Sequence, residues 1–271
     1  MSLFDGCPEI VDRHLRITDE WAGIKPRYMS PTSLLQMEEE NLPDGRELAC
    51  DLFGQMMRNW GAAGCPSTSS RQNWRFTKNV NFDDKERGPE VPLERTISRM
   101  TGEDWANQIP VDSGLLGKSA KTLDLAGREG DVLDLIELKV DANTPLSAAI
   151  QVLTYGLTNV FFQVNRDRLL PKGLECESLD PKQLQLHVLA PVSFYDRFEK
   201  KRSWLKAFEQ AMCEGVIKFS NQFQCADYPR VVHFGFLGFP IDFSWDQSRH
   251  NDEAYRSVVK NAFDQRSQYY S

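Results

Sequence analysis

The chain has 271 residues, of which 41% are hydrophobic, and it carries a formal net charge of −7 at pH 7. This length accommodates one decorated α/β domain or two small domains, and the acidic balance counts against extensive contact with nucleic-acid phosphates, which requires clustered Lys and Arg. The sequence has no run of about 18 apolar residues and no N-terminal basic segment ahead of an apolar stretch, so we expect neither a membrane-spanning helix nor a secretory signal.

Six cysteines and four histidines are scattered along the sequence. No Cys-x-x-Cys pair and no metal-binding spacing of cysteine to histidine occurs, which argues against a zinc site or an iron–sulfur cluster. We therefore expect reduced thiols and a cytoplasmic protein.

Changes of composition divide the chain into three expected parts. Residues 1–88 predict a partly helical N-terminal extension, residues 89–245 a core, and residues 246–271 a polar helical tail. The charged segment 82–89 is the expected boundary between the extension and the core.

The N-terminal part contains two informative segments. Residues 47–60 are typical of an amphipathic helix, with an apolar stripe formed by Leu48, Leu52, Met56 and Trp60. Farther on, Trp74 and Phe76 alternate with basic side chains, and two interpretations are open. The rings stack on unpaired bases, or the segment is a surface strand with a solvated face. The basic residues are Arg71, Arg75 and Lys78.

The core alternates short apolar runs with amphipathic segments, which predicts an α/β fold. Two of its apolar runs, 123–126 and 132–140, are separated by a short turn at 127–131 and predict a β-hairpin. The other expected elements, in chain order, are a helix at 92–100, a strand near 107–111, a helix from 144 toward 162, a strand at 184–192, a helix at 203–223 and a strand at 231–236, followed in the tail by a helix at 252–264.

Charged residues stand inside both runs of the hairpin. Glu137 and Lys139 point to the same face because side chains alternate along a strand, and Asp124 on the partner strand can meet them at one point. Asp134 falls on the opposite face, and we expect it to face solvent or the turn. Burying charged groups in a sheet is unfavourable unless they pair or hold a metal ion, so this cluster indicates a function.

The residue types suggest metal-assisted hydrolysis of a phosphodiester. Asp124 and Glu137 supply the hard oxygen ligands that Mg²⁺ prefers, and such an ion lowers the pKa of a bound water and stabilises charge on a phosphoryl oxygen. Lys139 then positions the attacking water or neutralises developing charge. The alternative is an ion pair between Glu137 and Lys139 on a solvated sheet face.

Asp124, Glu137 and Lys139 on a hairpin, with a helix directly after it, resemble the PD-(D/E)XK nuclease superfamily. Gln151 and Tyr155 on that helix are similar to the Gln-x-x-x-Tyr helix of its RecB-like branch, although ordinary half-buried helix residues would also fit the spacing. The resemblance spans about residues 90–240.

The resemblance implies a restriction-endonuclease-like core, with helix, three strands, helix and strand around a central mixed β-sheet. It implies a nuclease dependent on Mg²⁺ or Mn²⁺, with Asp124 and Glu137 as metal ligands, Lys139 as the catalytic cation and Gln151 as an accessory. Glu94 is the best match to an additional acidic ligand, or else an exposed helix charge. DNA is the expected partner ahead of RNA, and a homodimer is possible. The chain departs from the pattern at Leu123, where the name-giving Pro would stand.

Other segments mimic nucleotide or nuclease motifs. Residues 114–119 end like a phosphate-binding loop, but Asp112 occupies the first Gly position and no room remains for the required helix. Lys118 and Lys121 are instead expected to flank the hairpin near substrate phosphates. The Glu-x-Lys at 199–201 stands in no apolar run and is rejected.

Two alternatives to an active enzyme remain open. The first is a catalytically idle nuclease-like fold that acts as a nucleic-acid or protein binding module, which the acidic balance favours. The second is a structural subunit of an assembly, for which Trp204, Tyr269 and Tyr270 are expected to be surface aromatics. A basic group at 197–206 is expected to begin a helix and remain solvated.

Overall fold

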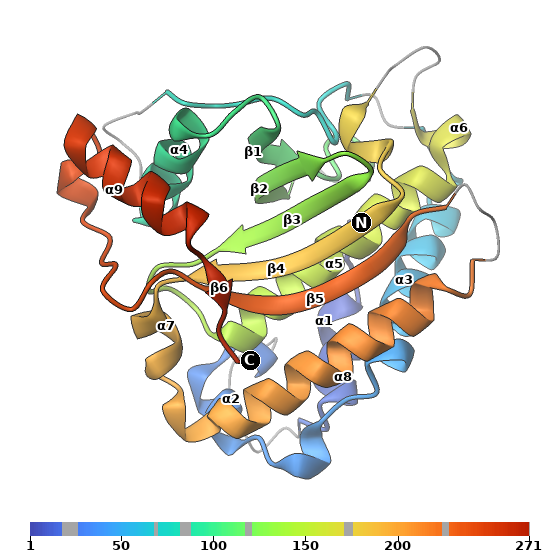
Figure 1. Cartoon of the computed structure of the whole chain (residues 1–271). Coiled ribbons are helices and arrows are strands. Elements are labelled where there is room, and N and C mark those ends of the chain that lie inside the picture. The colour runs from blue at the N-terminus through green and yellow to red at the C-terminus, as the bar shows by residue number, and fades with distance from the viewer. Residues whose placement is uncertain are drawn as a thin grey trace.

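A computed structural model describes residues 1–17, 27–67, 70–81, 88–116, 121–170, 176–223 and 228–270. Within these ranges the strands form one six-stranded sheet in the order β1-β2-β3-β4-β5-β6 (Figure 1). Strands β3, β4 and β5 run parallel, and the other neighbours pair antiparallel. The strands are β1 (Trp105–Pro110), β2 (Thr122–Glu129), β3 (Val132–Leu138), β4 (Gln183–Ala190), β5 (Arg230–Gly238) and β6 (Ser267–Gln268).

Helices cover both faces of this sheet (Figure 1), so the expected α/β class with a central mixed sheet flanked by helices is confirmed. One face carries α1 (Cys7–His14), α3 (Gly45–Ala62), α5 (Pro145–Val164) and α8 (Arg202–Ser220), and the other carries α4 (Glu90–Met100) and α9 (Glu253–Asp264). Three short helices are α2 (Pro31–Gln36), α6 (Arg166–Leu169) and α7 (Val192–Asp196). The predicted elements are present, with bounds shifted by a few residues.

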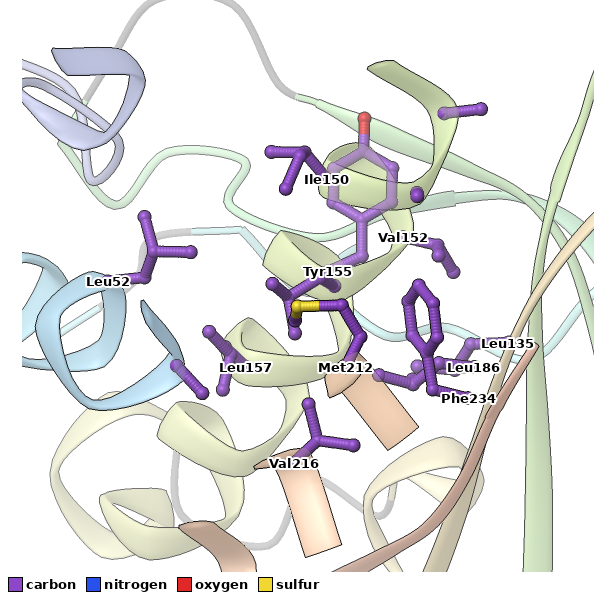
Figure 2. Close-up of a cluster of buried hydrophobic side chains, with 14 of the residues drawn as sticks. Leu52, Leu135, Ile150, Val152, Tyr155, Leu157, Leu186, Met212, Val216 and Phe234 are labelled. Atoms are coloured by element: carbon purple, nitrogen blue, oxygen red, sulfur yellow. The ribbon is translucent and has the colours of Figure 1, made fainter. Parts of the chain in front are cut away.

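Helix α5 is the centre of the larger hydrophobic core. Figure 2 shows its Val152 and Leu157 among Leu186 of the sheet and Met212 of α8. Strands β3 and β4 are apolar on both sides because helices pack on both sides. The second core, between the sheet and α4 and α9, contains Leu93, Ile97, Leu125, Ile136, Leu138, Leu189, Val259 and Phe263.

The N-terminal helix α3 packs into the same core as α5 and α8. Its predicted apolar stripe is buried there, because Leu48, Leu52 and Met56 are each 0% exposed. Where α3 crosses α8 the backbones touch, because a Cβ on Gly215 would lie 2.2 Å from the carbonyl carbon of Gly45. The expected division of the chain at 88 and 245 stays a prediction, and segment 82–87 lies outside the described residues.

The surface-strand interpretation of the segment around Trp74 is wrong, and so is the stacking of bases on Trp74. Trp74 is fully buried and has a φ of 58°, and its amide donates a hydrogen bond to the carbonyl of Pro110 at 2.8 Å. Phe76 is half-buried against the same core, and the segment is neither strand nor helix. The indole ring therefore anchors this loop to the core and has no face free for stacking on a base.

Two of the three aromatics expected on the surface are also buried. Trp204 is 7% exposed and Tyr270 is 2% exposed, which removes them as support for an assembly surface. The basic group does begin a helix, α8, but it is not simply solvated. Arg197 donates a hydrogen bond to the carbonyl of Asn143 at 3.1 Å, and Lys201 donates one to the carbonyl of Met37 at 2.5 Å.

Two further findings concern the chain as a whole. Cys7, Cys50, Cys65, Cys176 and Cys213 are free thiols, whereas Cys225 lies outside the described ranges. In the described part of the chain, none of the helices combines the length and apolar character needed to cross a membrane.

The close crossing of α3 and α8 gives a test of this packing. Gly215→Ala places a methyl group against the backbone of α3, so we expect a loss of about 1–3 kcal/mol in the free energy of unfolding. Thermal unfolding followed by circular dichroism measures it, with about 2–4 °C in Tm for each kcal/mol.

Gly54→Ala is the matched control, because Gly54 also lies inside a helix but has only the flexible Arg58 side chain near it. It should raise stability by about 0.5–1 kcal/mol through the better helix propensity of Ala. Equal effects of the two substitutions would contradict the tight crossing.

Candidate active site

The predicted hairpin is formed by β2 and β3, with a tighter turn than expected. Glu129 pairs with Val132, so only Gly130 and Asp131 form the turn, and residues 127–129 belong to β2. Gly130 has a φ of 59°, a conformation that glycine adopts without steric penalty. The turn fixes the register that brings position 124 opposite position 137.

Asp124 lies where the two strands separate. The last paired residues are Leu125 and Ile136, and beyond them the amide of Leu138 donates a hydrogen bond to Asp124 Oδ2 at 2.8 Å. The carboxylate thus replaces a backbone acceptor at the fork. Asp124 keeps part of its surface in solvent, so a ligand can reach it.

Glu137 and Lys139 form a buried ion pair on one face, as predicted. Lys139 Nζ contacts Glu137 Oε1, and the two residues are 7% and 0% exposed. The alternative of a solvated surface pair is therefore wrong. Burial alone would lower the pKa of Lys139, but the charges of Glu137 and Asp124 outweigh it and raise the pKa above its ordinary value. Lys139 therefore remains an ammonium ion.

Glu94 is buried beside this pair, so its interpretation as an exposed helix charge is wrong. It is 2% exposed, and its Oε1 accepts a hydrogen bond from Asn107 Nδ2 at 2.5 Å. Burial, together with the nearby charge of Asp124, raises its pKa well above the ordinary value. Helix α4 thus brings a third carboxylate to the fork.

Glu90 is a fourth carboxylate that the sequence reasoning missed. It is half-buried in the first turn of α4, and its Oε1 accepts a weak hydrogen bond from the amide of Val140 at 3.4 Å. Its charge also acts on the pKa values of Asp124 and Lys139. The four-residue spacing from Glu94, which puts both residues on one helix face, was the signal that could have revealed it.

The electrostatics of these residues suit a divalent cation. Burial is the main cause that raises the pKa values of Asp124 and Glu137, and repulsion between carboxylates adds to it for Glu137. Glu137 Oε2 is buried and has no hydrogen-bond donor among the described residues, and the charge of Asp124 acts on the Glu137 carboxylate. Two ionised carboxylates repel each other, and binding of a proton or a cation relieves that repulsion.

The donor set fits Mg²⁺ better than a metal that needs a complete cage of side chains. In the described ranges no three His, Cys, Asp or Glu side chains already converge as a metal-binding group. Mg²⁺ commonly uses one or two carboxylates and keeps several waters, so a convergent trio is not required. Asp124 and Glu137 meet this requirement, and the charge of Asp124 acts on the nearby Glu94.

Helix α5 begins directly beside the site. The Thr144 hydroxyl accepts a hydrogen bond from the amide of Ser147 at 3.0 Å, so Thr144 is the N-cap of this helix. One face of this helix brings Gln151 and Tyr155 together, with Gln151 Nε2 donating to the Tyr155 hydroxyl at 3.1 Å. In Figure 2 the Tyr155 hydroxyl points away from the core side chains Met212 and Val216. Burial mainly, and then the charge of Glu137, raises the pKa of Tyr155.

Asp134 is on the opposite face of β3, as predicted, but it does not simply face solvent. Its Oδ1 lies 2.6 Å from His187 Nδ1, and its Oδ2 lies 4.0 Å from the guanidinium of Arg266. His187 is 5% exposed, so this cluster is largely buried. It lies beside Arg266, which directly precedes β6, and on the face of β3 opposite to Glu137.

The segment that resembled a phosphate-binding loop leads into β2 and not into a helix. Asp112 Oδ1 accepts a hydrogen bond from the amide of Lys121 at 2.7 Å, which explains an acidic residue at that position. Lys121 is exposed and flanks the hairpin as expected, whereas Lys118 lies outside the described residues.

Comparison of the chain with protein-family models, with curated proteins and with solved structures finds no match.

The buried carboxylates should make the metal-free protein less stable at neutral pH. Because the pKa of Glu94 is raised in the folded state, its contribution to stability is present in acid and is lost as pH rises through the folded pKa. Glu94→Gln keeps an acceptor for Asn107 and removes the charge. We expect a higher Tm than wild type in EDTA, with a difference that grows from about pH 4 to pH 8.

Glu103→Gln is the control, because the Glu103 side chain is fully exposed. Its unfolding free energy should stay within about 0.5 kcal/mol of wild type at every pH. A Glu94→Gln protein that is no more stable than wild type at pH 8 would show that Glu94 carries no unfavourable buried charge.

Proposed function

We propose that this chain is a nuclease of the PD-(D/E)XK type that hydrolyses phosphodiester bonds with Mg²⁺ or Mn²⁺. The observation that carries the proposal is the buried Lys139–Glu137 pair beside Asp124, with Glu137 Oε2 buried and without a donor in the part of the chain that the structure describes. A solvated structural ion pair would not leave an acceptor in this state. The element order α4, β1, β2, β3, α5, β4 supports a restriction-endonuclease-like core.

In this proposal each carboxylate has a distinct part. Asp124 and Glu137 hold the divalent cation, Glu94 assists from α4, and Glu90 adds negative charge that strengthens cation binding. When bound, the cation supplies Lewis-acid stabilisation of the charge that develops on the phosphodiester. Lys139 neutralises only part of the negative charge of these carboxylates. The remaining charge is unfavourable in the metal-free protein and becomes favourable when the cation binds.

Lys139 acts as a fixed positive charge and not as a general base. Its pKa is raised, so it holds its proton at neutral pH and cannot accept one from water. An ammonium group at the fork orients an attacking water and stabilises the negative charge of the phosphorane-like transition state. Gln151, tied to Tyr155, is an accessory that positions the substrate from α5.

DNA is the proposed substrate ahead of RNA, and the acidic net charge restricts how it binds. With a net charge of −7, the chain has little excess positive charge for phosphate contacts, and the exposed Lys121 beside the hairpin is the lysine that we propose for one of them. The same acidity favours the second candidate function, a nuclease-like fold that binds without cleaving. Only the nuclease needs the carboxylates for metal binding and turnover, so this requirement distinguishes the two candidate functions.

The first test is cleavage of linear, circular, single-stranded and structured DNA and RNA with Mg²⁺ or Mn²⁺. We expect wild type to cleave at least one of these substrates, and Asp124→Ala and Lys139→Ala to lose about 10²-fold or more of the rate, because each removes transition-state charge stabilisation. Lys200→Ala, which removes a lysine from an exposed turn, should retain activity. Cleavage that persists in both site variants, or no cleavage of any substrate, would exclude the proposal.

The second test measures the metal ion directly. Isothermal titration of wild type with Mn²⁺ should give a saturable site that Glu137→Gln weakens by about tenfold or more, because a neutral amide is a poor ligand for a hard cation. Glu103→Gln should bind as wild type does. Unchanged Mn²⁺ affinity in Glu137→Gln would remove Glu137 as a ligand, even if cleavage is observed.

A further inference from the structure

A cavity of about 350 Å³ opens beside the candidate active site. It lies between the N-terminal half of α5, helix α1 and the 3-10 helix η1 (Arg27–Met29). Gln151 and Tyr155 line it, and Tyr155 is near enough to Glu137 for that charge to raise its pKa. The cavity therefore lies next to the site at the fork.

The cavity combines apolar walls with a few polar groups. Phe4 and Val11 line one side, Ile150 lines another, and the Tyr28 ring adds an aromatic surface. Gln151, Ser147 and Thr154 contribute polar groups. Lys121 is the one cationic side chain among the described lining residues, and it is exposed. This composition is typical of sites that hold a flat, partly polar ring next to an anion.

The size and charge of this region favour one unpaired base over a duplex. The volume lies at the lower end of the range for small-molecule sites, so a single base enters it and a stacked base pair does not. A base must leave its stack before it can enter such a pocket, which is easiest in single-stranded nucleic acid. Apolar and aromatic contacts with bases also compensate for the scarcity of phosphate contacts on an acidic chain.

We infer that this cavity binds an unpaired nucleobase of the substrate, next to the phosphodiester at the carboxylates, and that Lys121 contacts a neighbouring phosphate. The substrate class is then single-stranded DNA or a frayed DNA end. This inference rests on the proposed nuclease function for the role of the base in cleavage, but the binding itself is measured without turnover.

Binding is tested with the full chain in EDTA, by fluorescence anisotropy of labelled oligothymidylate. Competitors are the same oligonucleotide with abasic nucleotides and a relaxed, covalently closed circular duplex, which has neither ends nor a single-stranded loop. We expect oligothymidylate to bind about tenfold or more tightly than either competitor. Thr154→Phe, which places a ring in the cavity, should weaken oligothymidylate binding by about tenfold. Thr154→Ser keeps both the hydroxyl group and the open cavity, and should bind as wild type does.

Lys121→Ala gives a second measurement that does not depend on repacking, since Lys121 is exposed. It should reduce the magnitude of the slope of log affinity against log salt concentration by about 1, as the loss of one phosphate contact does. Lys200→Ala should leave this slope unchanged. Circular dichroism confirms that Thr154→Phe is folded.

Cleavage assays of the same preparations with Mg²⁺ separate the hypothesis of a base-binding cavity from the hypothesis of nuclease activity. Equal affinity for abasic and intact oligonucleotides, or unchanged binding by folded Thr154→Phe, overturns the inference even if Asp124-dependent cleavage is present. Base-dependent binding that Thr154→Phe abolishes supports the base site. If such binding occurs without any cleavage, the proposed nuclease function fails and the cavity remains a nucleobase site.

Discussion

The buried pair of Lys139 and Glu137 is the constraint on which the rest of the site depends. It places one ammonium ion among carboxylates that are removed from water, and it neutralises only one of them. Asp124 and Glu94 are left with raised pKa values, so the cluster lowers the stability of the metal-free fold at neutral pH. Retaining such a cluster makes physical sense where charge has to be stabilised during a reaction.

The apolar layers on both sides of the sheet make this arrangement possible. Each fully buried Leu or Phe contributes about 1.5–3 kcal/mol, and both faces of β3 and β4 are covered by such residues. The two cores therefore hold the strands in register, so that the fork between β2 and β3 stays at one position. The carboxylates can then be close together without the sheet separating to relieve their repulsion.

The N-terminal helices connect the proposed chemistry with substrate choice. Helix α3 packs against α8 through facing glycine backbones, and α1 lies over α5 at the cavity beside Gln151. The part of the chain that precedes the hairpin thus shapes the surface next to the carboxylates at the fork. In our proposals the sheet supplies the metal ligands and the N-terminal part supplies base recognition.

Local patterns in the sequence determined the types and order of the elements and the meeting of Asp124, Glu137 and Lys139. Side-chain alternation and a short turn are local properties, so residues within one hairpin are placed without knowledge of the rest of the fold. The tertiary structure alone decided that Glu90 and Glu94 reach the fork from α4, that Trp74 is buried, and that Asp134 pairs with His187. The cavity between α1 and α5 also belongs to this second group. These contacts join segments far apart in the chain, and the packing that creates them depends on the shapes of both partners. The local periodicity of the sequence carries no information about that packing.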